Sequence, residues 1–131
     1  MNAENIAGLL KKLSPVKYAC DWDNVGMHVG YKDNEINTIL VTLDIDDAAI
    51  DRAIEINADM IVSHHPLIFH GIKQINDDNI TGRRIMRLIE NGINAYCMQI
   101  MTASEEWRMR RHQDFQCQKM MFLRKYVTAR E

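Results

Sequence analysis

Two adjacent histidines, His64 and His65, stand at the end of an apolar run, residues 60–69. Neutral imidazole is the commonest metal ligand among protein side chains. Neighbouring side chains on a regular strand point to opposite faces, so two adjacent rings converge only where the strand ends. Pro66 fixes its own backbone angle and biases His65 away from helical geometry, which favours a strand that stops and turns here. The pair is a candidate for binding neighbouring metal ions, although two histidines at a strand exit are also compatible with a purely structural role.

The elements that must position this pair alternate along the first 98 residues. Apolar residues at helical spacing predict three helices: one that ends at Ser14-Pro15, one that is capped by Asp46 or Asp47, and one over residues 81–91 that stops at Gly92. Apolar runs predict three strands: residues 38–43, 58–63 and 93–98. This alternation predicts an α/β fold with a parallel-sheet core and right-handed crossovers.

Polar residues follow the predicted strands at the end where such sheets bind ligands. Asp44 follows the first strand, His64 and His65 follow the second, and the third ends at Met98. Asp44 is a candidate for orienting a histidine or binding substrate, because carboxylates commonly fix the tautomer of a ligating imidazole. A strand-end turn or a helix cap explains Asp44 as well. The shared strand edge is the main argument from the residues for a functional site.

Several other side chains carry weaker signals. Asp23 and Asn24 either shape the rim of a pocket or form an Asx turn before Gly26. The remaining candidates are expected to have structural roles: Trp22 as a packing anchor, His28 and His70 as surface or rim residues, and Cys97 as a buried strand residue.

Composition indicates one modest domain, since the chain has 131 residues, 47% of them hydrophobic and 26% charged. A net charge of -2 gives no basic footprint for nucleic acid. No apolar run approaches a membrane span, and the opening residues do not read as a signal peptide. Three cysteines without C-x-x-C spacing argue against a disulfide framework. We therefore expect a cytoplasmic protein without a membrane partner, and a nucleic-acid partner is not indicated.

Three motifs in order, WDNVGM at 22–27, VTLD at 41–44 and SHHPLIF at 63–69, resemble the GTP cyclohydrolase I type 2 homologues, also called Nif-three-like proteins. The resemblance implies an α/β fold assembled as toroidal hexamers, with a pair of divalent metal ions per subunit. By position it makes His64 and His65 the first two metal ligands. It also implies a dimetal hydrolase that acts on a nucleotide or related heterocycle; zinc, manganese and iron all suit such ligands.

After Met98 the sequence departs from the family pattern. The family's His-Thr-Asn-x-Asp is expected next, but residues 99–103 read QIMTA, and the family's downstream histidine and glutamate ligands are missing. Residues 99–131 hold seven Lys/Arg, four Asp/Glu and four of the nine methionines. We interpret residues 1–98 as the N-terminal α/β part of the metal-binding domain, truncated, and residues 99–131 as a basic tail, helical or disordered. A frame-shifting deletion in the gene is our hypothesis for the tail.

Three functions stay open from the sequence. The first is a metal-dependent hydrolase with GTP-cyclohydrolase-like ring opening, whose catalytic residues are not assigned. The second is a non-catalytic metal-binding interaction or regulatory protein. The third is an inactive truncated product. In each case a homo-oligomer is expected, because a three-stranded unit of this size buries limited surface.

Overall fold

The computed structural model describes residues 1–19 and 21–98, so the predictions for the tail lie outside the described residues. The helices are α1 (Ala3–Leu13), the short 3₁₀ helix η1 (Val16–Tyr18), α2 (Asp47–Glu55) and α3 (Ile80–Glu90). The strands are β1 (Gly26–Val29), β2 (Ile39–Thr42), β3 (Met60–Ser63) and β4 (Asn94–Cys97). The predicted alternation of helices and strands is confirmed.

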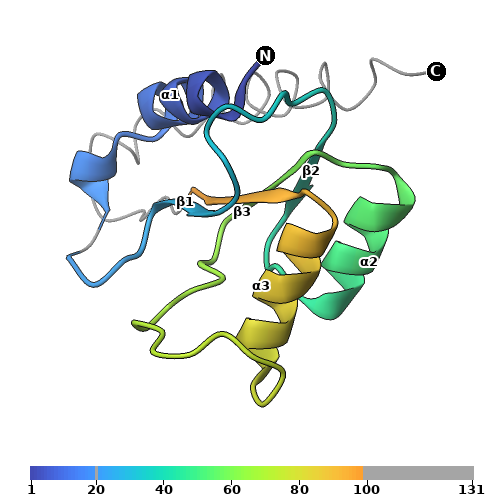
Figure 1. Cartoon of the computed structure of the whole chain (residues 1–131). Coiled ribbons are helices and arrows are strands. Elements are labelled where there is room, and N and C mark those ends of the chain that lie inside the picture. Colours follow the sequence, from blue (N-terminus) through green and yellow to red (C-terminus); the bar gives the residue numbers. More distant parts are fainter. Residues whose placement is uncertain (20, 99–131) are drawn as a thin grey trace.

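The sheet lies between α1 on one face and the pair α2 and α3 on the other (Figure 1). Side chains alternate along the central strand β3. Met60 and Val62 pack in the core that contains Leu10 of α1, whereas Ile61 packs in the core that contains Leu88 of α3. Because β3 is buried on both faces, it reads in the sequence as a continuous apolar run.

The order of the strands is β1-β4-β3-β2. The pairs β2–β3 and β3–β4 are parallel, which confirms the predicted parallel core. The sheet also has an antiparallel edge strand, β1, in a region for which the sequence analysis predicted no strand. A register shift between Met27 and Val29 sends these two side chains into opposite cores. This bulge breaks the two-residue period by which a short strand is recognised in a sequence.

Helix ends follow the expected chemistry, with one refinement. Asp46, not Asp47, caps α2: its carboxylate accepts a hydrogen bond from the Ala49 N–H at 2.7 Å. Helix α3 is followed by Gly92 with a φ of 66°, a left-handed conformation that favours glycine. Within the described part of the chain, no helix is both long and apolar enough to cross a membrane.

The buried Asn94 side chain ties β4 to the turn after β1. Its Nδ2 donates to the Tyr31 carbonyl at 2.8 Å, and its Oδ1 accepts from the Asn34 amide at 2.9 Å. The same turn needs Gly30, whose φ is 110°, because a Cβ there would lie 2.2 Å from Asn94 Oδ1. Asn94 therefore holds the edge strand against the core.

We predict that Asn94→Ala lowers the free energy of unfolding by about 1–3 kcal/mol, because it leaves the Tyr31 carbonyl and the Asn34 amide without their partner. Urea unfolding followed by circular dichroism measures the change. Asn5→Ala, at an exposed position of α1, is the matched control and is expected to change little. Equal stabilities of the two variants would contradict the role assigned to Asn94.

Candidate functional site

The carboxyl ends of the three parallel strands meet at one edge of the sheet. In the register of the sheet, Ser63 of β3 pairs with Thr42 of β2 and with Cys97 of β4. The Cys97 thiol donates to the His64 carbonyl at 3.4 Å, and Cys97 is buried as predicted. The prediction that the residues after these strands share one edge is confirmed as far as Met98, whose N–H donates to the Ser63 carbonyl.

His65 is held by the strand end of β2. Its Nδ1 lies 2.8 Å from Asp44 Oδ1, and its backbone N–H donates to the Leu43 carbonyl at 2.9 Å. Because an ionised carboxylate only accepts hydrogen bonds, Nδ1 carries the proton and Nε2 keeps the lone pair that binds metals. Of the alternatives for Asp44, the contact supports the one in which it orients a histidine, since Asp46 is the helix cap.

The two imidazoles converge as expected for a splayed strand end. The ring centroids of His64 and His65 are 4.8 Å apart, and the ring planes are tilted by 51°. Burial lowers the pKa of His64 below its usual value, and the neighbouring His65 lowers it further. The Met98 backbone and the carboxylates of Asp23 and Asp44 act in the opposite direction. The net effect favours neutral His64, the form that binds a metal.

The loop before β1 packs on the chain that leaves the histidines. The side-chain amide of Asn24 donates to the Ile68 carbonyl at 2.7 Å. The centroids of the Trp22 and Phe69 rings are 6.1 Å apart, and Trp22 is 58% exposed, so Trp22 packs against Phe69 at the surface. Both carboxylate oxygens of Asp23 are buried, without a hydrogen-bond partner in the part of the chain that the structure describes. These contacts hold the loop of residues 22–24 against the segment that follows the histidines.

His28 braces the same two segments, a role that the sequence analysis missed. Its Nε2 donates to the Asn24 carbonyl at 2.9 Å, and its Nδ1 accepts from the Ile68 N–H at 3.4 Å. Burial lowers the pKa of His28, although the hydrogen bond to the Asn24 carbonyl opposes this effect. His28 lies within β1, and a prediction of this strand would have placed its side chain in the sheet; the sequence did not predict β1.

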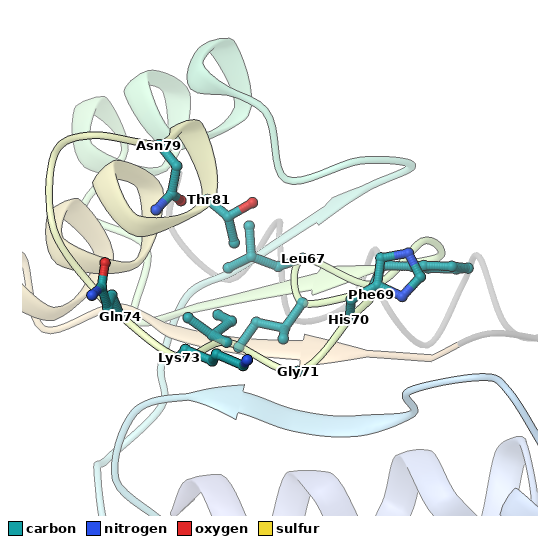
Figure 2. A pocket seen from close by; sticks show the side chains of 10 residues that line it. Leu67, Phe69, His70, Gly71, Lys73, Gln74, Asn79 and Thr81 are labelled. Carbon is teal, nitrogen blue, oxygen red and sulfur yellow. The ribbon is translucent and has the colours of Figure 1, made fainter.

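A cleft of about 400 Å³ is lined by residues 67–74, which follow the histidine pair in the chain, and by Asn79 and Thr81. Figure 2 shows Lys73 and Gln74 on one side and, at the start of α3, Asn79 and Thr81 on the other. His70 lines this cleft and is exposed, as predicted for a rim residue. His64 and His65 do not line this cleft.

These donors fit part of a divalent-metal site. Two converging imidazoles and a nearby buried carboxylate are suitable groups, whereas a zinc site commonly has three or four protein ligands. Across residues 1–19 and 21–98, no three His, Cys, Asp or Glu side chains are grouped closely enough to hold a metal ion. The segment after Met98, where the family pattern has an aspartate and this sequence reads QIMTA, lies outside those residues.

Comparisons with known proteins match the described part of the chain. Residues 1–100 match the family described as Duf34/NIF3 (NGG1p interacting factor 3). The protein from Bacillus subtilis called GTP cyclohydrolase 1 type 2 homolog is 36% identical over 96 residues, which are 73% of this chain and 26% of that protein. The protein of the same name from Staphylococcus epidermidis is 42% identical over 94 residues, or 72% of this chain and 25% of that protein.

Solved structures give the same result. Staphylococcus aureus protein SA1388 has a TM-score of 0.72 and 36% identity, over 76% of this chain and 32% of that one. A Bacillus cereus protein related to NIF3 has a TM-score of 0.71 and 31% identity, over 76% of this chain and 27% of that one. The chain spans about a quarter of the length of the two curated relatives described above.

We predict that the protein loses stability as the pH falls below about 6.5, the usual pKa of histidine. The pKa of His28 is lowered in the folded state, so the unfolded chain binds more protons in this range and protonation favours unfolding. Urea unfolding between pH 7.5 and pH 5 measures this slope. His28→Gln is expected to show a shallower slope than the unsubstituted protein; an unchanged slope would contradict the assignment.

Proposed function

The chain belongs to the Duf34/NIF3 family, and from this premise we propose that His64 and His65 bind divalent metal ions. The observation that carries the proposal is the contact between His65 Nδ1 and Asp44 Oδ1 at 2.8 Å. The ring centroids of His64 and His65 are 4.8 Å apart, so both imidazoles are close to this contact. The carboxylate fixes one imidazole in the tautomer that presents Nε2, as it does in many metal sites. The match to the family model and to the relatives confirms the family resemblance that was inferred from the motifs.

As the activity we propose metal-dependent hydrolysis of a nucleotide or a related heterocycle, in keeping with the names of the curated relatives. A divalent ion at such a site lowers the pKa of a coordinated water and so supplies a nucleophile near neutral pH. The chain's own contribution is orientation: Asp44 holds His65, while His28 and Asn24 brace the loop on the other side. The cleft lined by residues 67–74, Asn79 and Thr81, with Lys73 among them, offers room for an anionic substrate.

The wider setting is proposed on the same basis: two metal ions per subunit, a cytoplasmic location and a homo-oligomer, the hexamer implied by the family resemblance. Large apolar side chains on the surface support association. Val41 and Leu43 on or beside the edge strand β2 are 44% and 58% exposed, and Trp22 and Phe69 are 58% and 50% exposed. Apolar groups gathered at a surface commonly mark an interface.

One observation favours a non-catalytic metal-binding role as the second candidate. The described residues supply fewer than three grouped ligands, and a hydrolytic centre needs enough ligands to hold its ions and still leave one position open. Metal-dependent turnover of GTP by the full chain would favour the hydrolase. Metal binding without turnover of GTP would favour the binding role.

We predict that the purified protein retains divalent metal and that the double variant His64→Ala/His65→Ala loses it, because both imidazoles are removed. Elemental analysis of metal per chain makes the measurement. His70→Ala, which removes an exposed histidine from the neighbouring cleft, is the matched control and is expected to keep the metal. A wild-type protein without affinity for zinc, manganese or iron would contradict the proposal.

We also predict that Asp44→Asn weakens metal affinity by about 10–100-fold, the usual effect of removing the carboxylate behind a ligating histidine. The variant loses the acceptor that holds His65 Nδ1, but both imidazoles remain. Zinc competition with a chromogenic chelator measures the change. An affinity equal to that of the unsubstituted protein would show that Asp44 does not orient His65 for metal.

A further inference from the structure

Asp23 lies in a loop that is fixed against the chain leaving the histidine pair. At the preceding position, Trp22 packs against Phe69, with the two ring centroids 6.1 Å apart. At the following position, the side-chain amide of Asn24 donates to the Ile68 carbonyl at 2.7 Å. Both contacts reach residues that follow His64 and His65 by only a few positions, so the loop brings Asp23 to the same edge of the sheet.

The Asp23 carboxylate is buried, and its charge is not compensated by any group in the described ranges. Neither oxygen has a hydrogen-bond partner there, and no ion pair joins Asp23 to a described lysine, arginine or histidine. A buried carboxylate normally has hydrogen-bond partners, a paired cation or a coordinated metal, because leaving water without compensation is costly. The fold therefore holds a negative charge in a place suited to a cation.

That charge acts on the histidine pair. The field of Asp23 favours the charged form of His64 and so opposes the effect of burial on its pKa. Asp44 acts on His64 in the same direction and contacts His65. Two carboxylates from different segments therefore bring negative potential to two imidazoles.

We propose that Asp23 is a third protein group of the His64/His65 metal site and stabilises the bound cation through its negative charge. This inference rests on the proposed metal-binding function. Direct ligation is not invoked, because no three such side chains within the described residues are grouped closely enough to share an ion. The cation would supply the positive charge that the buried carboxylate lacks among the described residues.

The test compares Asp23→Asn with Asp21→Asn in the full 131-residue chain. Asn keeps the size of the side chain but removes its charge, and Asp21 is an exposed aspartate two positions earlier in the same loop. Zinc affinity is measured by chelator competition, and melting temperature is measured with and without zinc. We expect Asp23→Asn to weaken zinc binding about 10–100-fold, the range found for groups behind metal ligands, and Asp21→Asn to leave it unchanged.

The melting temperatures give an independent readout. Without metal, Asp23→Asn is expected to melt higher than the unsubstituted protein, because it removes a buried uncompensated charge; zinc is expected to raise its Tm less. Undiminished zinc affinity in Asp23→Asn, in a protein that binds zinc, would overturn this inference alone. Failure of the unsubstituted protein to bind zinc, manganese or iron would overturn the proposed function and this inference together.

Discussion

The parallel register between β2 and β3 is the constraint on which the site depends. Because Thr42 pairs with Ser63, the two strands end level with each other, and the residues that follow them meet. Asp44 and His65 are 21 positions apart, yet their side chains are 2.8 Å apart. The two apolar cores on either face of β3 keep this register, since a slip by one residue would exchange the side chains of the two faces.

The sequence was sufficient to predict what depends on local pattern. Apolar runs identified β2, β3 and β4, helical spacing identified α1, α2 and α3, and the order of these elements indicated a parallel sheet. The carboxyl ends of the strands then pointed to Asp44 and the two histidines, whose rings lie close together. These predictions needed only the spacing of apolar residues along the chain and the turn at Pro66.

The features that were missed depend on contacts between distant segments. The strand β1 is four residues long and bulged, so its pattern is too short and too irregular to recognise. The role of His28 depends on Ile68, 40 positions away, and the burial of Asp23 depends on the fold of the loop around it. Trp22 was predicted to be a packing anchor, but its partner Phe69 is distant in the sequence and could not be named from it; the Trp22 side chain packs there while 58% exposed.

A crystal structure of the zinc-loaded protein, with the ion located by anomalous scattering, would test the central claim most directly. The account predicts zinc at about 2.0–2.1 Å from a ring nitrogen of His64 and from Nε2 of His65, with Asp44 still in contact with Nδ1 of His65. Zinc bound elsewhere would contradict the account. Zinc bound to Nδ1 of His65, with Asp44 displaced, would also contradict the account, because the contact between Asp44 and His65 would then not orient Nε2 toward the metal.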